Sequence, residues 1–525
     1  MKKRIFTLLL ALLLLTGAVS AAFSDQAEIE AKYTEAVSKM SETGVIGGFP
    51  NGTFRPKDTL TRAQAAKILC TVLEGAQGAE AIASAANFND VPTSHWATKY
   101  IGYCTEKGVV SGVGNGSFNP EGKLTGYAFG KMLLVAYGHN AEKEGLTGSG
   151  WDANVDKLLK SEGRSFGLTV TDKPISRQEA CQLAYNFTLP VADTSKYEDV
   201  KIDLKTESTL YRTQGRSYLN DDGLVMLWPG NAIEFTAELG GDLTLHYKAE
   251  EAGYLWVFVD GVADTRARLT KSETEKALVL ASVRPGVHTV RIVRDNDLNS
   301  KGLLTVWQSL SFRGVKSTVK ATEQKKLLIE YVGDSITSGK GVMSNAQYKS
   351  DDPNHSATHS YAYVSAGLLD ADYSMVSRGS CGFIKTSKSC PKTMANMYDY
   401  INCFAADDQL IKYDFSRKAD VVILALGTND GSKDKTAFAD AVKAMIVQIR
   451  ERNGENVKIV VQYGMMTKSH EKDLPEIAKE VGVYSLKVTK NNEGGSSRAK
   501  GTGHPGVAGQ AKVAEELAAF LKTIL

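Results

Sequence analysis

The chain has 525 residues, of which 42% are hydrophobic and 23% are charged, a composition typical of folded domains rather than of disordered chains. This length exceeds what one hydrophobic core supports, so several domains are expected. The 62 basic and 60 acidic residues nearly cancel, and this balance argues against nucleic acid as a partner.

The first 22 residues have the three parts of a secretory signal. Lys2, Lys3 and Arg4 precede an apolar stretch over residues 5–15, and the small residues 18–22 offer a cleavage site. The apolar stretch is shorter than the roughly 20 residues that span a bilayer, and no later stretch is long and apolar enough. The sequence therefore predicts an exported protein with no integral membrane segment after signal cleavage.

A glycine-rich pattern occurs twice near the N-terminus. Residues 44–56 (Gly-Val-Ile-Gly-Gly-Phe-Pro-Asn-Gly-Thr-Phe-Arg-Pro) correspond to residues 108–120. Each copy contains an Asn-Gly turn, and Phe54 and Phe118 are expected in the core below it. Thr61 and Thr125 are expected to cap the helix that follows each copy. The expected helices are at residues 33–43, 63–73, 97–107 and 127–136.

These repeats resemble the S-layer homology domain. The resemblance includes Phe88-Asn89-Asp90-Val91, His95-Trp96 and Thr61-Arg62-Ala63-Gln64. It places α-helical repeats within residues 23–190, at about 28–80 and 85–140, with a degenerate third copy at 150–190. That third copy carries Ile175-Ser176-Arg177-Gln178-Glu179 in place of the threonine-arginine motif.

In that family, three copies form a module that binds anionic secondary polymers of the bacterial cell wall through the arginine of the motif. The resemblance therefore implies a cell-wall location, with Arg62, Arg177 and Thr61 as wall-polymer-binding residues, because a guanidinium can engage carboxylate groups with two hydrogen bonds. The second copy has Gly126 where arginine is expected. The alternative is that these helices pack together and hold no ligand.

The six cysteines lack metal-like C-x-x-C spacing, and buried free thiols are the preferred interpretation. They are Cys70, Cys104, Cys181, Cys381, Cys390 and Cys403. Cys381 and Cys390 could pair in an oxidising medium if their geometry allows it.

Over residues 200–320 the pattern changes to short runs in which apolar and polar residues alternate, as is typical of an antiparallel β-sandwich. Strands are expected at residues 232–237, 243–247, 255–259 and 288–293, with turns at Gly240-Gly241, Asp260-Gly261 and Pro285-Gly286. Trp228, Trp256 and Trp307 fit either the core or a sugar-binding platform, and burial statistics favour the core.

Residues 325–525 alternate Val- and Ile-rich strands with helical patterns, which predicts a parallel sheet covered by helices. Strands are expected at residues 327–332, 373–377, 421–426 and 457–463, and helices at 362–369, 437–452 and 507–525. Ser335, Asn429 and residues 379–382 follow such strands. Because the carboxyl ends of parallel strands meet at one edge, these residues can converge.

Ester hydrolysis by a hydroxyl group needs a base and donors for the oxyanion. Ser335 is the candidate nucleophile, and His504, just before the last helix, is the best-placed base. His355 and His359 have the spacing of a metal pair, but they lie in a polar loop with no third ligand evident.

Four blocks resemble the SGNH (GDSL) hydrolase superfamily: Gly333-Asp334-Ser335, residues 377–382, Gly427-Thr428-Asn429-Asp430 and His504-Pro505. The resemblance implies an α/β three-layer fold for residues 325–525, with Ser335 as nucleophile. It implies an oxyanion hole from the Ser335 N–H, a glycine N–H and the Asn429 side chain. Gly382 is the preferred glycine, with Gly379 in reserve, and Gly379 and Arg378 are candidate substrate-binding residues. Asp334 is expected to organise the turn.

The family usually has aspartate three residues before the histidine, where this chain has Gly501. A backbone carbonyl can orient the imidazole in its place. One branch, carbohydrate esterase family 2, has a jelly-roll sandwich before the hydrolase domain, and some members use a serine-histidine dyad. Trp228-Pro229-Gly230, Val259-Asp260-Gly261 and Gly286-Val287-His288 resemble that sandwich. Its members remove O-acetyl groups from xylan or mannan.

The leading interpretation is an exported, wall-anchored esterase that deacetylates a polysaccharide through an acyl-serine on Ser335 and His504, with no cofactor and no metal. One alternative is a short-chain lipid esterase or lysophospholipase of the same superfamily. Another is a catalytically impaired, wall-anchored carbohydrate-binding protein. The polymer is either dietary or part of the cell's own wall.

Overall fold

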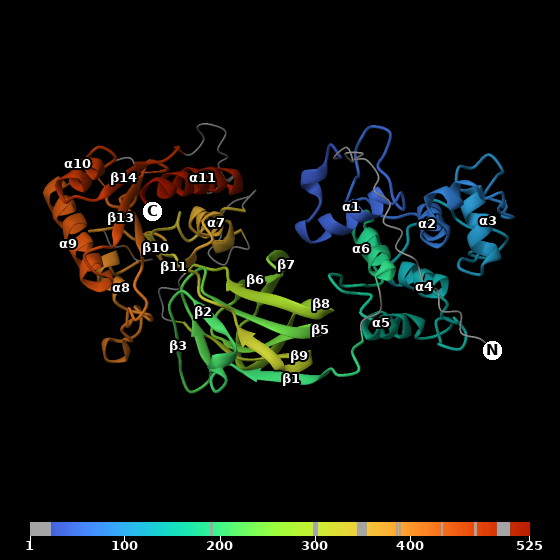
Figure 1. Ribbon diagram of the computed structural model, residues 1–525, viewed down its shortest axis with the longest axis horizontal. Helices are drawn as coiled ribbons and strands as arrows, with labels where there is room; N and C mark the ends of the chain where they lie inside the picture. Colours follow the sequence, from blue (N-terminus) through green and yellow to red (C-terminus); the bar gives the residue numbers. More distant parts are fainter. Residues whose placement is uncertain are drawn as a thin grey trace. The chain divides into compact units, whose positions relative to one another are not determined.

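The computed structural model describes residues 23–189, 193–297, 303–343, 354–384, 387, 390–431, 434–466, 470–490 and 504–525 (Figure 1). The predicted signal, residues 1–22, lies outside this part of the chain. The chain forms two compact units, residues 1–190 and 191–525. Within the described part, no helix combines the length and the apolar character needed to cross a membrane.

The first unit consists of three helix pairs joined by glycine-rich loops. The pairs are α1 (Thr34–Glu42) with α2 (Arg62–Glu80), α3 (Thr98–Glu106) with α4 (Gly126–Ala136), and α5 (Trp151–Ser161) with α6 (Arg177–Thr188). The second helix of each pair begins at a capping hydroxyl: Thr61 and Ser176 form capping boxes, and the Thr125 side chain accepts from Ala128 N. The predicted helices and caps are confirmed, and the degenerate third copy also forms a helix pair.

The three copies close into a ring of backbone hydrogen bonds. Leu60 N donates to Ile175 O at 2.9 Å, Ile175 N donates to Leu124 O at 2.9 Å, and Leu124 N donates to Leu60 O at 3.1 Å. All three residues are buried. Each copy thus satisfies the next one around a pseudo-threefold axis, so the third copy is needed to complete the ring.

The glycine-rich loops are fixed by one aspartate per copy. Asp25 accepts from Phe54 N and Arg55 N, each at 2.7 Å, and Asp90 accepts in the same way from Phe118 N and Asn119 N. These bonds hold the Phe54 and Phe118 rings fully buried, as the sequence predicts.

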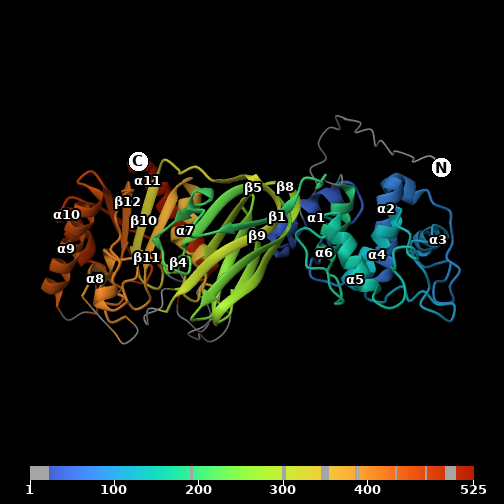
Figure 2. The same ribbon diagram turned by 90° about the horizontal axis from the view of Figure 1, so that it is seen from below.

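The second unit contains an antiparallel sheet and a parallel sheet. The antiparallel strands are β1 (Glu198–Asp203), β2 (Arg212–Gln214), β3 (Ser217–Leu219), β4 (Leu224–Met226), β5 (Ala232–Ala249), β6 (Gly253–Val259), β7 (Val262–Leu269), β8 (Ser272–Arg294) and β9 (Thr305–Ala321). The long strands β5, β8 and β9 run side by side (Figure 2). Trp228 and Trp307 are fully buried, which confirms the core interpretation for both.

Two of the three predicted turns in this region are wrong. Gly240-Gly241 and Pro285-Gly286 lie inside β5 and β8, where the pairing shifts register between Leu239 and Gly241. They form a bulge because Gly241 adopts a positive φ of 76° and Gly240 lies against Pro285. Asp260-Gly261 is a true turn between β6 and β7, with both residues at positive φ.

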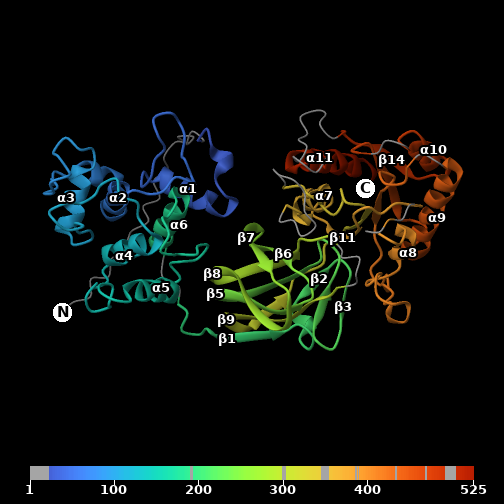
Figure 3. The ribbon, with the colours of Figure 1, turned by 180° about the vertical axis from the view of Figure 1, so that it is seen from behind.

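The parallel sheet has the order β11-β10-β12-β13-β14. Its strands are β10 (Leu328–Gly333), β11 (Asp372–Ser377), β12 (Val421–Ala425), β13 (Lys458–Tyr463) and β14 (Tyr484–Lys487). Helices α7 (Tyr361–Leu368) and α11 (Val507–Ile524) cover one face, while α8 (Met394–Tyr398), α9 (Lys435–Asn453) and α10 (Asp473–Glu480) lie on the other (Figure 3).

Alternate residues of the parallel strands supply two separate cores. Val422 and Leu424 pack with α9, whereas Val421 and Ile423 pack with α7 and α11. Burial on both faces explains why these strands read as continuous apolar runs in the sequence. The predicted strands and helices of this region are confirmed, but β14, α8 and α10 were not predicted.

Candidate active site

Ser335 lies in the turn that follows β10. Gly333 closes the strand, and a side chain at this position would collide with Thr337. Asp334 accepts from Ile336 N at 2.9 Å through Oδ1, and Lys340 N donates to Ser335 O at 2.9 Å. Asp334 therefore organises the turn, as the sequence predicts, and the turn fixes Ser335 at the carboxyl edge of the sheet.

His504 lies far from Ser335 in the sequence, just before the last helix, but next to it in the structure. The distance from His504 Nε2 to Ser335 Oγ is 2.9 Å, which is within reach for proton transfer. His504 lies just before α11, and residues 501–503, where the family's aspartate is expected, lie outside the described residues. The predicted nucleophile and base thus come together.

Gln510 links α11 to the nucleophile turn. Its Nε2 donates to Ile336 O at 3.1 Å, and its Oε1 accepts from Tyr361 N at 2.9 Å. The side chain is 1% exposed. Because His504 precedes this helix by three residues, the Gln510 bonds tie the helix that follows His504 to the turn that carries Ser335. The sequence interpretation missed Gln510, although a polar residue on the buried face of an apolar helix was a usable signal.

Asn429 follows β12 and faces the nucleophile turn. Its Nδ2 donates to Asp334 Oδ2 at 3.0 Å and to Cys381 O at 2.8 Å. Asn429 therefore connects the turn that carries Ser335 to the glycine block at residues 377–382. Both amide protons are engaged in the free protein, so donation to a further acceptor requires that one of these bonds be shared.

The backbone N–H groups of Ser335 and Gly382 both have no acceptor among the described residues. A side chain at Gly382 would collide with the carboxylate of Asp430, so this position requires glycine. Gly379 differs, since its N–H donates to Asp297 Oδ2 at 3.1 Å. The geometry favours Gly382 over Gly379 as a donor to a bound oxyanion.

Asp297 belongs to the antiparallel part of the unit yet contacts the glycine block. Arg378 Nη1 and Gly379 N both donate to its Oδ2, at 2.9 and 3.1 Å. The loop after β8 thereby holds the segment that leads to Gly382. Nothing in the local sequence pairs this aspartate with a block 80 residues away, so sequence reasoning missed it.

Replacement of Asp297 by alanine should release Gly379 and Arg378 and displace Gly382. We expect kcat to fall about tenfold with little change in KM, because misplaced donors weaken the transition state more than substrate binding. Steady-state kinetics on a soluble acetyl ester would measure this. Asp297→Asn should recover most of the loss, and Asp242→Ala, an exposed aspartate in β5, is the matched control. An unchanged kcat in Asp297→Ala would contradict the positioning role of Asp297.

The pKa of Asp334 is raised to about 7. Burial is the main cause, repulsion from Asp430 and Asp297 adds to it, and the hydrogen bond from Ile336 opposes it. Because the folded-state pKa lies above the ordinary value of 3.8, the folded protein binds this proton more tightly than the unfolded chain. The contribution of Asp334 to stability is therefore present below about pH 4 and is lost as the pH rises towards 7.

Asp334→Asn should remove this pH dependence. Relative to the wild type, the variant should gain at least about 1 kcal/mol in its free energy of unfolding between pH 4.5 and 7.5, since one pKa unit corresponds to about 1.4 kcal/mol. Urea unfolding at the two pH values would measure it. A difference between variant and wild type that stays constant with pH would mean that Asp334 does not titrate in this window.

His359, the second histidine of the spaced pair, is engaged by neighbouring side chains. Its Nδ1 lies 2.8 Å from Ser356 Oγ, and Trp256 packs at 5.7 Å between ring centroids. Among the described residues, no group of three or more histidine, cysteine or acidic side chains is arranged to hold a metal.

All six cysteines are buried free thiols, which confirms the preferred interpretation. Cys381 and Cys390 lie close together, because their Sγ atoms are 3.8 and 3.3 Å from the same acceptor, Lys392 O. The hydrogen bond from Cys390 and burial raise the pKa of the Cys381 thiol. Reactivity of the Cys381 thiol as a nucleophile is therefore disfavoured, whereas the same hydrogen bond lowers the pKa of the Cys390 thiol.

In the first unit, Arg62 and Arg177 occupy equivalent positions in different copies. Arg62 Nε donates to Phe118 O at 2.7 Å and Nη2 donates to Ser111 O at 2.6 Å. Arg177 Nε donates to Phe54 O at 2.9 Å and Nη2 to Gly47 O at 2.8 Å. Each arginine thus holds the glycine-rich loop of a neighbouring copy, a structural role that the sequence did not reveal.

Arg177 also lines a pocket of about 640 Å³. Neither its Nη1 nor Lys67 Nζ donates to any described residue, and Trp96 at the pocket is 51% exposed. Thr61, Gln64, Lys67 and Glu121 complete its polar lining. Arg62 is not part of this pocket, and at Gly126 a side chain would press against the backbone of Thr171.

Known proteins are similar to both units of this chain. The S-layer homology domain matches residues 22–66 and 87–126. A cell wall amidase of Bacillus anthracis is 33% identical over 162 residues, which cover 29% of this chain and 30% of the amidase. The first curated relatives are matched over no more than 30% of their own length.

An acetylxylan esterase / glucomannan deacetylase of Cellvibrio japonicus is 26% identical over 270 residues, covering 50% of this chain and 73% of that protein. The solved structure of a family two carbohydrate esterase from Cellvibrio japonicus superposes with a TM-score of 0.54 at 20% identity, covering 62% of this chain and 98% of that one. At this identity the likeness shows a shared fold. The chain thus combines S-layer homology domains with the fold of a family two carbohydrate esterase.

Proposed function

We propose that this chain is a cell-surface-anchored carbohydrate esterase that removes O-acetyl groups from a polysaccharide. The observation that carries the proposal is the 2.9 Å contact between His504 Nε2 and Ser335 Oγ at the carboxyl edge of the parallel sheet. The likeness to a named acetylxylan esterase over 73% of its length supports the substrate class. We also propose that the antiparallel strands form a jelly roll and that the parallel sheet is an SGNH hydrolase domain.

The reaction follows from the positions of these groups. His504 Nε2 takes the proton of Ser335 Oγ, and Oγ attacks the acetyl carbonyl carbon. The negative charge on the carbonyl oxygen is held by the N–H groups of Ser335 and Gly382. The C–O bond to the sugar then breaks, and the imidazolium returns the proton to the sugar oxygen. Water attacks the acetyl-serine in the same way and releases acetate.

Asn429 is the third proposed donor to the oxyanion. In the free protein its amide donates to Asp334 and Cys381, so catalysis requires it to share one of these protons. The dyad needs no metal or organic cofactor for these steps.

The test of the activity is acetate release by the mature protein from acetylated xylan and acetylated mannan. A series of p-nitrophenyl esters of increasing chain length should run beside it. We expect release from the polysaccharides and a steep fall with chain length. Preference for long-chain esters would instead support a lipid esterase. No hydrolysis of any ester would leave a wall-anchored binding protein as the better account.

We further propose that the first unit attaches the enzyme to an anionic wall polymer through the pocket lined by Arg177 and Lys67. Both cations have donors that no described residue uses, and a partly exposed Trp96 offers a face for a sugar ring. Arg62 is proposed as a weaker contact, since it lies outside this pocket. Thr61 lines the same pocket and is proposed as a further contact.

Lys67→Ala should reduce binding of the mature protein to purified cell walls about tenfold, because it removes one uncommitted charge without disturbing the loop bonds that Arg177 makes. Sedimentation with wall fragments at increasing salt would measure it. Lys57→Ala, an exposed lysine outside the pocket, should bind as the wild type does. Equal binding by all three proteins, or by walls stripped of their anionic polymer, would contradict this anchoring site.

A further inference from the structure

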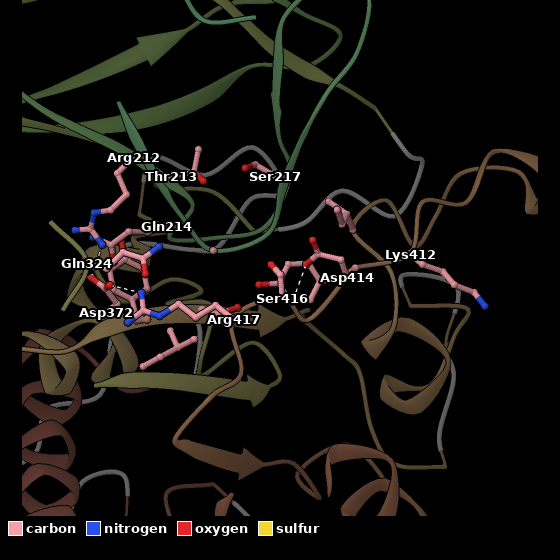
Figure 4. Close-up of a pocket in the computed structure, with 16 residues that line it drawn as sticks. Arg212, Thr213, Gln214, Ser217, Gln324, Asp372, Lys412, Asp414, Ser416 and Arg417 are labelled. Carbon is pink, nitrogen blue, oxygen red and sulfur yellow. Dashed lines mark hydrogen bonds and ion pairs between the residues drawn. The ribbon is translucent and has the colours of Figure 1, made fainter. Parts of the chain in front are cut away.

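A pocket of the second unit lies between the antiparallel and parallel sheets (Figure 4). Its volume is about 330 Å³, at the lower end of the range for small-molecule sites, and it is lined by the first residues of β10 and β11, Leu328 and Asp372. The polar side chains that matter here are Arg212, Gln214, Ser217, Gln324, Asp372 and Arg417. We call this the rear pocket.

The rear pocket is separate from the candidate active site. It adjoins the first residue of β10, whereas Ser335 follows the last. The six residues of β10, at about 3.3 Å each, separate the two sites by about 20 Å, so the sites lie at opposite ends of the parallel strands. A ligand here would not touch the reacting atoms.

The buried charges of the rear pocket compensate one another. Arg212 donates to Asp372 at 2.5 Å and to Glu234 at 3.0 Å. Arg417 also pairs with Asp372, and its Nη2 donates to Lys325 O at 2.6 Å. Each of these buried carboxylates therefore already has an arginine partner, so the pocket offers no unpaired carboxylate to a cationic ligand.

Amide and hydroxyl groups of the rear pocket are uncommitted. Gln214 is only 4% exposed, and its Oε1 has no hydrogen-bond partner among the described residues. The side chains of Gln324 and Ser217 likewise make no hydrogen bond to any described residue. Amides and hydroxyls both donate and accept, and a buried amide oxygen without a partner destabilises the fold unless a ligand satisfies it.

Tyr373 and Tyr413 supply the apolar wall of the same pocket. A ligand that matches this lining presents several hydroxyl groups on a compact ring with apolar faces. Saccharide units have this chemistry, and the volume accommodates a mono- or disaccharide unit rather than a longer segment.

From these observations we propose that the rear pocket is a non-catalytic binding site for a neutral saccharide unit, held by the amides of Gln214 and Gln324. The proposal rests on the lining of the pocket and not on the reaction at Ser335. In a polysaccharide-active enzyme, this pocket would be a second binding site for the same polymer, which raises the effective substrate concentration at the active site.

The experiment is a calorimetric titration of the mature, full-length Ser335→Ala protein with xylobiose, mannobiose and glucuronate. We expect a neutral disaccharide to bind, and this binding to weaken about tenfold or more in Gln214→Met and in Gln324→Ala, as when a site loses its hydrogen-bonding partner. Gln308→Met is the matched control, because Gln308 also has a buried oxygen without a partner but lies in β9, outside the pocket. Gln324 is exposed, so its variant serves if Gln214→Met fails to fold.

Unchanged disaccharide binding in both pocket variants would overturn the proposal, and so would preference for glucuronate or no binding up to the solubility limit. With Ser335 restored, both variants should hydrolyse p-nitrophenyl acetate as the wild type does. A protein that binds disaccharide in the rear pocket but releases no acetate would contradict the proposed function and leave this inference intact.

Discussion

Ser335→Ala is expected to lower acetate release by a factor of at least about 10³, because removing the nucleophile leaves only binding and the oxyanion donors to accelerate the reaction. The structure gives a specific reason to expect so large an effect. Ser335 Oγ lies 2.9 Å from His504 Nε2, and its backbone N–H remains free of described acceptors. The fold should be retained, since the side chain is 8% exposed and contributes one hydroxyl. Acetate release from acetylated xylan, with circular dichroism to check the fold, measures both expectations.

Ser338→Ala is the matched control for this prediction. Ser338 lies three residues further along the same turn, is 1% exposed, and donates from Oγ to Ser335 O at 3.2 Å. It should lose less than tenfold, because it supports the turn without contacting a reacting atom. Equal losses in the two variants would mean that the turn is simply sensitive to change. Full activity in Ser335→Ala would disprove its role as nucleophile.

The order of elements in residues 325–525 could be predicted because each candidate functional side chain follows a recognisable strand or precedes a recognisable helix. Ser335 follows β10, Asn429 follows β12, and His504 precedes α11. Parallel strands buried on both faces give long apolar runs, which are the clearest local signal in a sequence. For this reason the sequence alone could predict that Ser335 and His504 lie close together.

What could not be predicted depends on contacts between distant segments. Asp297 and Gln510 have no local pattern that names Gly379 or Ile336 as their partners. The glycine pair at 240 and 241 has the same composition whether it forms a turn or a bulge, and only the partner strand β8 decides between them. Helix α10 and strand β14 are short, so their periodicity is weak.

The same limit explains the arginines of the first unit. The motif predicts that Arg62 and Arg177 bind a polymer, but the fold shows each of them donating to the loop of a neighbouring copy. Only the closed ring of three copies brings these loops and helices together. The polymer site proposed here therefore depends on Lys67 and Trp96 as much as on the motif's arginine.

The largest stability effect is expected at Arg216, which joins the two sheets of the second unit. Arg216 lies between β2 and β3, is 1% exposed, and donates from Nη2 to Glu330 Oε1 at 2.9 Å. Its guanidinium also lies 4.5 to 5.0 Å from the ring centroids of Tyr398, Tyr413 and Phe415. Glu330 is in the middle of β10, the strand that carries Ser335, so an arginine from the antiparallel part completes the core of the parallel sheet.

Arg216→Met should lower the free energy of unfolding by about 3 to 5 kcal/mol, because it leaves the Glu330 carboxylate buried without its cation. The midpoint of urea unfolding would report this loss. Arg216→Met combined with Glu330→Gln should recover part of it, since the second change removes the unpaired charge.

Arg313→Met is the control, because that arginine is 61% exposed and pairs with an exposed Asp199. This substitution should lower the free energy of unfolding by less than about 1 kcal/mol. If Arg216→Met were no more destabilising than Arg313→Met, the Arg216–Glu330 pair would not stabilise the junction of the two sheets. A large loss that Glu330→Gln partly restores would instead establish that the strand presenting the nucleophile depends on a side chain from outside its own sheet.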